Sequence, residues 1–272
     1  LKPGSVTLDG KDSQPISALL IAANFIEGVT EVTVTDPGEK PWVEMTLSWF
    51  DRLNIPYLSE DYTHYRIQGK SPYTGFHYTV KGDWSSAAFP LAAALVTRST
   101  LKLNGLDLEE PQGDKQLIPI LEAMGAKITW DNDQLVVHAT ETLKGTTIDV
   151  NDLIDALPIL AVIGCFAEGE TRLVNGAVAA TKESNRLEVI ASELRKMGAA
   201  IEEIDDGLLI HHSPLVGAEV DSHKDHRIAM ALTVAALGAK GATRIKDIEC
   251  VRKTFPNFCP SLQKVGALME RQ

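Results

Sequence analysis

One pattern recurs about every 70 residues along this chain, and the repetition limits the folds that the chain can adopt. Four aspartates, Asp12, Asp83, Asp155 and Asp225, each precede a stretch rich in alanine, leucine and isoleucine. A fixed period of that length marks a supersecondary unit that is used several times. Aspartate is a favoured helix N-cap, because its side chain accepts a hydrogen bond from an unpaired backbone N–H. We therefore predict four helices, each starting just after one of these aspartates.

These four helices have no polar face, which predicts that they are buried. A short β run follows each of them, and then comes an amphipathic helix. The second helix is clearest in the third unit, where Leu187, Ile190, Leu194 and Met197 share one face. Pairs of strands follow in the first three units, whereas the fourth unit ends after its second helix. The sequence predicts an α/β fold made of repeats of strand, buried helix, strand, surface helix and paired strands.

The composition excludes several classes of protein. The 272 residues are 44% hydrophobic and 23% charged, as is usual for a globular protein. The net charge of −11 argues against nucleic acid or an anionic membrane as a partner. No apolar run reaches the roughly 18 residues of a membrane span. The three cysteines, Cys165, Cys250 and Cys259, show no paired spacing, so we expect a reduced cytoplasmic protein without disulfides or zinc. We also expect no other metal and no cofactor.

The buried helices also suggest an anion-binding cleft. Helices that share one environment tend to run together, so their N-termini meet on one side. Each N-terminus carries roughly half a positive charge and unpaired N–H groups, which favour an anion. Arg227 follows Asp225 and His226 at the start of the fourth buried helix, where it adds a full charge. From these residues alone, an equally good interpretation is that Arg227 only pairs with the capping Asp225.

Two further basic clusters stand at predicted helix starts. Lys182 and Arg186 are four residues apart, so on a helix they share one face, where their charges repel unless an anion or a carboxylate lies between them. Arg252 and Lys253 precede another predicted helix start, with Pro256 in its first turn. A solvated helix start and a surface loop are the plainer interpretations of these clusters.

Six short motifs, taken together, resemble a known family of enzymes. In chain order they are "SQPISALL", "GDWSSAAFPLAAA", "PQGD", "KESNR", "DHRIAMA" and "RKTFPNF". Their order and spacing, over essentially the whole chain, resemble the 5-enolpyruvylshikimate-3-phosphate synthases, the enolpyruvyl transferases of the shikimate pathway. A sister family that acts on UDP-N-acetylglucosamine shares the fold but lacks these forms of the DHR and KTFP motifs. The resemblance implies an inside-out α/β barrel type of fold and a role in aromatic amino acid biosynthesis.

The resemblance also implies a domain organisation. The family has six repeats in two domains, whereas four repeats are counted here. Residues 1–80 would then be the last repeat of the N-terminal-side domain, and residues 81–272 the three-repeat C-terminal-side domain. We expect the chain to be the C-terminal portion of the enzyme, inactive alone, with the missing N-terminal repeats as its natural partner. Because one repeat cannot bury its own apolar face, Ile16, Leu20 and Ile21 are expected to be exposed.

The implied reaction transfers the enolpyruvyl group of phosphoenolpyruvate to the 5-hydroxyl of shikimate 3-phosphate and releases phosphate. Asp155 matches the carboxylate that takes the hydroxyl proton, and Glu183 matches the acid that protonates the methylene carbon. Lys182 matches the lysine beside the reacting hydroxyl. Adding an alcohol across an enol double bond needs a base at oxygen and an acid at carbon. Two carboxylates in different environments can hold those opposite protonation states.

Substrate-binding residues follow from the resemblance in the same way. Arg186, Arg227 and Lys253 match the cations that hold phosphoenolpyruvate. That substrate carries a carboxylate and a phosphate, so two or three cations are needed in a poorly solvated cleft. Ser13 and Gln14 match part of the site for the shikimate ring and its phosphate.

The acceptor side departs from the family pattern. Glu39 and Trp42 stand where the family has serine and tyrosine, and Val178 and Ala180 stand where it has asparagine and arginine. A carboxylate at Glu39 is expected to repel a sugar phosphate. Two alternatives therefore stay open: an enolpyruvyl transferase with another phosphorylated or cyclic alcohol as acceptor, and a non-catalytic anion-binding domain derived from the enzyme.

Overall fold

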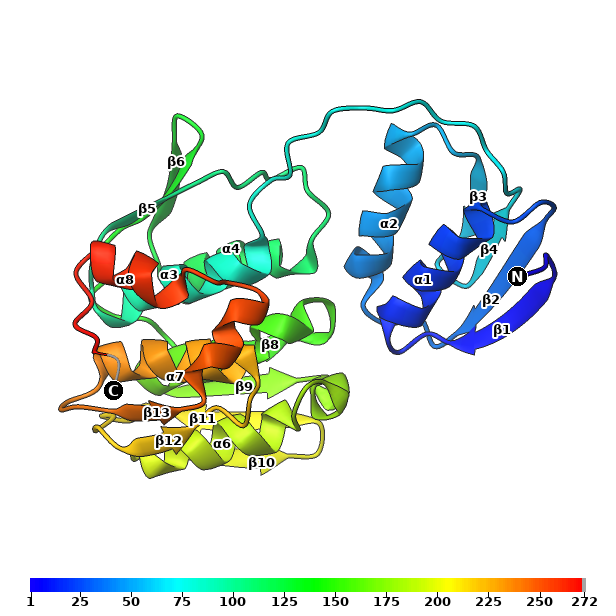
Figure 1. Cartoon of the computed structure of the whole chain (residues 1–272). Coiled ribbons are helices and arrows are strands. Elements are labelled where there is room, and N and C mark those ends of the chain that lie inside the picture. The colour runs from blue at the N-terminus through cyan, green and yellow to red at the C-terminus, as the bar shows by residue number, and fades with distance from the viewer. Residues whose placement is uncertain (271–272) are drawn as a thin grey trace. The chain divides into compact units, whose positions relative to one another are not determined.

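The computed structural model describes residues 1–270 and divides the chain into two compact units (Figure 1). Unit 1 comprises Leu1–Lys81 and Asp107–Gly113. Unit 2 comprises Gly82–Leu106 and the chain from Asp114 onward. Both units combine helices with sheets, so the predicted α/β class is confirmed. The assignment of residues 1–80 and 81–272 to particular enzyme domains stays a prediction.

Unit 1 is a four-stranded sheet with two helices on one face (Figure 1). The strand order is β1-β2-β4-β3, in which β1 and β2 are parallel and the other neighbours are antiparallel. Side chains of β2 alternate between buried and more exposed positions, because only one face of the sheet meets the helices. The elements are β1 (Ser5–Asp9), α1 (Ser13–Asn24), β2 (Thr30–Thr35), α2 (Lys40–Arg52), β3 (Tyr57–Glu60) and β4 (His64–Ile67).

Unit 1 buries most of its own apolar face, which corrects one expectation. Ile16 and Leu20 of α1 are buried in a core that also contains Val32 and Val34 of β2. Their predicted exposure is wrong, because the sheet of the same repeat covers that side of the helix. Ile21, on the other side of α1, is 48% exposed, as predicted.

Unit 2 is organised around three buried helices that pack against one another, α3 (Trp84–Val96), α5 (Leu157–Phe166) and α7 (His226–Gly238). Their burial confirms the prediction from their uniformly apolar sequences. The sheets have the orders β5-β7-β6, β10-β11-β9-β8 and β12-β13. Their strands are β5 (Leu101–Asn104), β6 (Ile128–Asp131), β7 (Gln134–Val137), β8 (Thr147–Asp149), β9 (Glu170–Val174), β10 (Ala200–Ile204), β11 (Gly207–His211), β12 (Glu219–Asp221) and β13 (Arg244–Lys246).

The amphipathic helices of unit 2 turn their apolar faces toward this core. On α6 the predicted stripe is confirmed, since Ile190, Leu194 and Met197 are buried and Leu187 is partly buried. These helices are α4 (Leu117–Ala123), α6 (Arg186–Lys196) and α8 (Phe258–Lys264), and the short 3-10 helices are η1 (Gly113–Gln116), η2 (Asn151–Ala156), η3 (Ala177–Thr181) and η4 (Ile248–Lys253). Within residues 1–270, no helix combines the length and the apolar character needed to cross a bilayer.

Three of the four repeated aspartates cap their helices as predicted. Asp12, Asp83 and Asp225 each accept a hydrogen bond from a backbone N–H in the first turn of α1, α3 and α7. Asp155 does not, because the chain first forms η2 and α5 starts only at Leu157. The carboxylate of Asp155 is therefore available for contacts with side chains.

Candidate active site

A cluster of charged side chains surrounds the N-terminal end of α7. Asp225, which is fully buried, caps this helix, and its Oδ1 accepts the backbone N–H of Arg227 at 2.9 Å. Four other segments of unit 2 contribute to the same network. Five of the residues expected to bind or transform substrate meet here: Asp155 of η2, Glu183 before α6, Arg186 of α6, Arg227 of α7 and Lys253 of η4.

Arg186 contacts three carboxylates of this cluster. Its side chain is 1% exposed, and each of its donor nitrogens meets a different carboxylate. Nε lies 2.9 Å from Asp225 Oδ2, Nη1 lies 2.7 Å from Asp155 Oδ1, and Nη2 lies 2.6 Å from Glu183 Oε2. These charge-assisted hydrogen bonds compensate for the burial of the guanidinium. The assignment of Arg186 as a direct ligand of phosphoenolpyruvate stays a prediction.

Asp155 lies between two guanidinium groups. Its Oδ1 faces Arg186, and its Oδ2 accepts from Arg227 Nη2 at 2.8 Å. Burial by itself would raise the pKa of Asp155, but the charges of Arg227 and Arg186 outweigh it and hold the pKa below its ordinary value. Asp155 is therefore ionised at neutral pH.

Glu183 is held by Arg186 on one oxygen and by Lys253 Nζ on the other. Burial would raise the pKa of Glu183, but the hydrogen bond from Lys253 and the charge of Arg186 lower it to about 2. The side chain of Lys253 is 59% exposed, so Lys253 can turn toward an arriving anion. In this arrangement Glu183 carries no proton, and it can become an acid only after a ligand draws its cations away.

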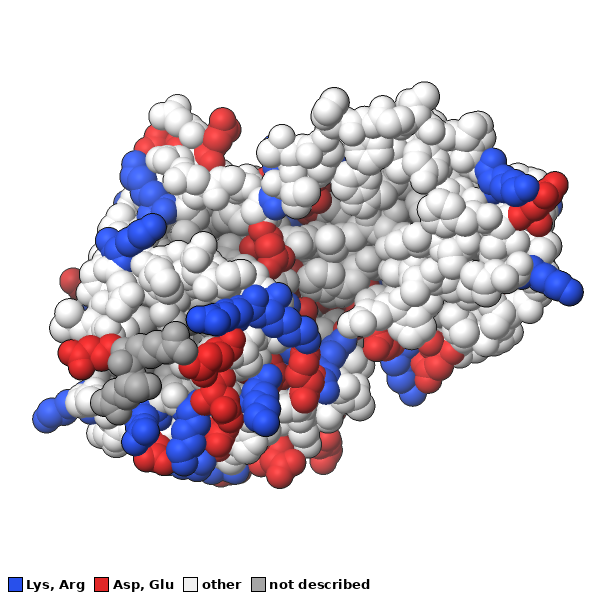
Figure 2. All heavy atoms as spheres, in the orientation of Figure 1, with Lys and Arg blue, Asp and Glu red and all other residues white. Residues whose placement is uncertain are grey.

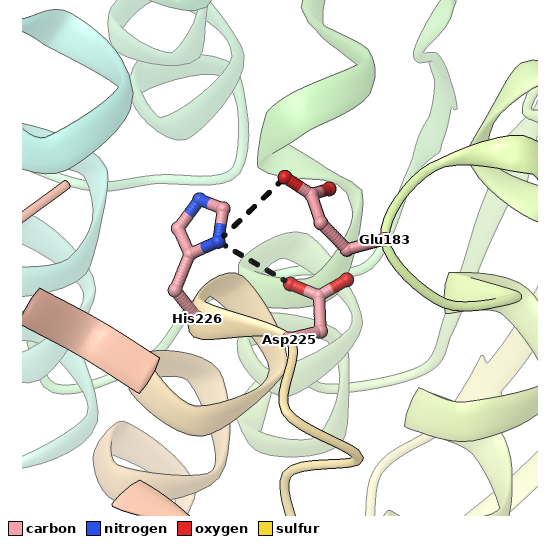
Figure 3. A group of neighbouring side chains, drawn as sticks. All are labelled: Glu183, Asp225 and His226. Carbon is pink, nitrogen blue, oxygen red and sulfur yellow. Dashed lines mark ion pairs between the residues drawn. The ribbon is translucent and has the colours of Figure 1, made fainter. Parts of the chain in front are cut away.

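His226 points its Nδ1 atom at two of these carboxylates (Figure 3). Nδ1 lies 3.8 Å from Glu183 Oε1 and 3.9 Å from Asp225 Oδ1, and it has no hydrogen-bond partner. The ring is 3% exposed, and burial together with the charge of Arg227 lowers the pKa of His226. His226 was not among the residues predicted for the site.

The same three side chains are the group whose ligand atoms are close enough to hold a metal ion, within 4.8 Å of one another, among the described residues. Their oxygens already accept from cations or from the backbone: Lys253 donates to Glu183 Oε1, and the Arg227 N–H donates to Asp225 Oδ1. A divalent ion would also add its charge beside three basic side chains. The electrostatics of the site therefore favour an anionic ligand over a metal.

Asp114 is a second residue that the sequence analysis missed. It is fully buried and accepts a hydrogen bond from Ser85 Oγ. Its Oδ1 atom has no partner. Burial, and then the charge of Asp155, raise the pKa of Asp114 to about 7 against the opposing effect of Arg227. The signal available in the sequence was the place of Asp114 in one of the six family motifs.

Two helices start at residues other than those predicted. Helix α6 begins at Arg186 after the N-cap Asn185, so Lys182, which is extended, does not share a helix face with Arg186. Lys253 ends η4, and α8 begins only at Phe258. Pro256 therefore precedes α8 instead of lying in its first turn.

On the acceptor side, Ser13 and Gln14 lie at the N-terminus of α1 in unit 1. Ser13 donates from both N (3.0 Å) and Oγ (2.9 Å) to Oε2 of Glu39, and both residues are buried. The backbone N–H of Gln14 donates to Asp12 Oδ1 at 2.9 Å. The Glu39 carboxylate thus takes the position at a helix N-terminus that favours an anion.

The surface of the molecule has no continuous basic area on the face shown in Figure 2. Acidic and basic side chains are intermixed over the part of unit 2 that contains α6, β10, β12 and β13. Such a surface matches the acidic net charge and differs from the basic stripe of a nucleic-acid-binding protein.

The chain is similar to known proteins over nearly its whole length. The family described as EPSP synthase (3-phosphoshikimate 1-carboxyvinyltransferase) matches residues 4–262. The 3-phosphoshikimate 1-carboxyvinyltransferase of Chlamydia pneumoniae is 46% identical over 265 residues, which cover 97% of this chain and 59% of that protein. The Acetivibrio thermocellus protein of the same name is 43% identical, with 98% and 63% covered. The chain therefore spans about 60% of the length of these curated relatives.

Solved structures show the same relationship. The structure of EPSP synthase from Acinetobacter baumannii superposes on all of this chain and on 64% of its own, with a TM-score of 0.85 and 30% identity. The enolpyruvyl transferase NikO from Streptomyces tendae superposes with a TM-score of 0.77 at 19% identity, which shows a shared fold only.

Proposed function

Because the chain belongs to the EPSP synthase family, we propose that it supplies the phosphoenolpyruvate side of a site that transfers an enolpyruvyl group to the 5-hydroxyl of shikimate 3-phosphate. The cluster at the N-terminus of α7 carries the proposal. It brings three cations, Arg186, Arg227 and Lys253, together with a buried helix end, and both features attract an anion.

In this proposal the carboxylates of the cluster accept hydrogen bonds from the same donors that the substrate would use. Three acidic side chains balance the three cations, so an arriving ligand with a carboxylate and a phosphate competes for the same donors. Arg227 and Lys253 are the accessible donors, since Arg227 keeps a small exposed area and Lys253 a large one. We assign these two side chains to the direct contacts with phosphoenolpyruvate.

Binding of that anion sets the protonation states that the reaction needs. When Lys253 turns to the phosphate, Glu183 loses the contact that most lowers its pKa, so its pKa rises and the protonated form, which can deliver a proton to the methylene carbon, becomes easier to reach. When Arg227 turns to the ligand, Asp155 becomes a stronger base for the acceptor hydroxyl. We assign Lys182 to the position beside that hydroxyl, as the resemblance to the family implies. Elimination of phosphate then reverses the proton movement at carbon.

We propose further that this chain is the C-terminal portion of the enzyme and does not turn over alone. The support is the length of the relatives and the apolar side of α1, where Ile21 and Phe25 are exposed. Without the remaining repeats the part of the site where Lys253 is 59% exposed stays open to water, which weakens charged contacts with substrate. A coupled phosphate-release assay with both substrates, run with and without the N-terminal repeats of a close relative added in trans, tests this. Turnover by the 272-residue chain alone near the rate of a full-length relative would refute it.

Titration calorimetry of the 272-residue chain with phosphoenolpyruvate tests the ligand assignment. Arg227→Ala should weaken binding by about 1–3 kcal/mol, the scale of a hydrogen bond to a charged group. Arg172→Ala, which removes an exposed cation of β9, should change it by less than about 1 kcal/mol. Shikimate 3-phosphate should bind the wild type and Arg227→Ala alike. Equal losses for both ligands would contradict the assignment of Arg227.

One observation favours a second candidate, an enolpyruvyl transferase with a different acceptor. The buried carboxylate of Glu39 already fills the N-terminus of α1 through Ser13. An acceptor that presents a neutral hydrogen-bonding group there avoids charge repulsion, whereas a sugar phosphate meets it. Comparing the affinities for shikimate and shikimate 3-phosphate distinguishes the two candidates, because tighter binding of shikimate would favour the second.

A further inference from the structure

The segment Asp221–Lys224 carries the end of β12 to the first residue of the site, Asp225. Its last two residues, His223 and Lys224, both have left-handed backbones, with φ of 51° and 60°. Neither is glycine, and this conformation is unfavourable for a residue with a Cβ atom. Such a turn needs support from outside the segment.

Glu193 of α6 gives that support. It is 2% exposed, and its Oε2 accepts the backbone N–H of Asp221 at 2.8 Å. Its Oε1 lies 3.2 Å from Nε2 of His223, and Lys196 Nζ lies 2.7 Å from both oxygens. Burial would raise the pKa of Glu193, but the hydrogen bonds from Lys196, Asp221 and His223 lower it, so the carboxylate stays ionised. A buried charge is tolerated here because each oxygen has two donors.

Ser222 anchors the same turn from its other side. Its Oγ donates to the backbone carbonyl of Asp247 at 3.2 Å and accepts the N–H of Lys224 at 3.1 Å. Its own N–H lies 3.4 Å from the carbonyl of Lys246 in β13. The turn is thus held between α6 and β13, and Asp225 follows at its end.

Helix α6 therefore supports Asp225 through two contacts. Arg186, in its first turn, holds the side chain of Asp225, and Glu193, seven residues later and so on the same side of the helix, holds the turn that delivers Asp225. Asp225 in turn fixes the first-turn N–H of Arg227. A shift of the turn would lengthen the contacts of Asp225 with Arg186 and with the start of α7.

We propose that Glu193 is a positioning residue: by clamping the turn Asp221–Lys224 onto α6, it sets the placement of Asp225 and hence of Arg186 and Arg227, without touching substrate. The link to phosphoenolpyruvate rests on the proposed function above. The proposed effect of Glu193 on the hydrogen bond from Arg186 Nε–H to Asp225 does not depend on it.

Glu193→Gln and Glu193→Ala in the 272-residue chain test the proposal. Glutamine keeps an acceptor for Asp221 but loses the charge that faces Lys196 and His223, so its effect should be partial, whereas alanine should remove the clamp. The control is Glu203→Gln, which alters an exposed ion pair on β10. Far-UV circular dichroism should show the same helix content in all four proteins.

Two readouts separate positioning from a merely structural role. The NMR signal of Arg186 Nε–H, which reports its hydrogen bond to Asp225, should shift in Glu193→Ala and shift less in Glu193→Gln. Affinity for phosphoenolpyruvate should fall on the order of tenfold in Glu193→Ala, below the ~100-fold that a 1 Å misplacement can cost. Glu203→Gln should leave both readouts unchanged.

The outcomes are distinct. An unchanged Arg186 Nε–H signal in Glu193→Gln and Glu193→Ala overturns the proposal, whatever happens to stability. If Glu193→Ala fails to fold, the Glu193→Gln signal decides alone, and no shift there overturns it. If the wild-type chain shows no binding of phosphoenolpyruvate, the proposed function fails, while a shifted Arg186 signal still supports the clamp.

Discussion

Replacing Arg186 with glutamine tests how the charged cluster is held together. The change removes three charge-assisted hydrogen bonds, of 2.9, 2.7 and 2.6 Å. Among residues 1–270, the donors that then remain for the fully buried Asp225 side chain are neutral: Ser184 Oγ and the N–H of Arg227. Removing one partner of a buried ion pair costs about 3–5 kcal/mol, since an uncompensated charge stays behind. We expect unit 2 to lose about 4 kcal/mol of unfolding free energy at pH 7, a large share of the ~5–15 kcal/mol of a typical domain.

The loss should depend on pH with a definite sign. Arg186 helps to lower the pKa of Asp155 and Glu183, in the case of Glu183 to about 2. Groups with a lowered pKa stabilise the folded state above their ordinary pKa of about 4, and this contribution is lost as the pH falls through the folded value. The difference between wild type and Arg186→Gln should therefore be full at pH 7 and should shrink as the pH falls from about 5 toward about 2.

Urea titrations at several pH values measure the free energy of unfolding. Hydrogen exchange of the α6 and α7 amides, at the same pH values, measures the stability of unit 2 specifically. Arg172→Gln is the control, because Arg172 is an exposed cation of β9 whose pairing with Glu170 is worth about 0–1 kcal/mol. A loss below about 1 kcal/mol for Arg186→Gln at pH 7, or one that does not change with pH, would refute the view that Arg186 neutralises buried carboxylates.

Three further predictions concern Asp114, Glu183 and Glu39. Asp114→Asn should stabilise the chain more at pH 8 than at pH 5, because a folded pKa raised from about 4 to about 7 costs stability progressively as the pH rises between those two values; equal urea midpoint shifts at both pH values would contradict this. Glu183→Gln, placed in a turnover-competent relative at the matching position, should cut turnover by roughly 10²–10⁴ with phosphoenolpyruvate binding retained, and a few-fold change would remove Glu183 from the mechanism. Glu39→Ser should let inorganic phosphate shift the amide NMR signal of Ser13 at concentrations about tenfold lower than in wild type.

Local chemistry let the sequence predict much of this fold and one part of the site. The spacing of apolar residues depends on the geometry of a single helix or strand, so the buried helices, the stripe on α6 and the α/β class were all predictable. N-capping is equally local, and it identified Asp12, Asp83 and Asp225. The motifs around Glu183 and Arg227 indicated the family because each is a short continuous stretch.

The tertiary structure decided which charges meet and therefore which of them are protonated. Asp155 was predicted to be a cap, but it bridges Arg186 and Arg227, which are 31 and 72 residues away. Asp114 was not predicted to belong to the site, and its complete burial near Asp155 raises its pKa. Burial and Coulomb interactions depend on distances in space, and nothing in the spacing along a chain specifies them. For the same reason the contacts of Glu193 with the turn before Asp225 could not be predicted, because they join residues 28 and 30 positions apart.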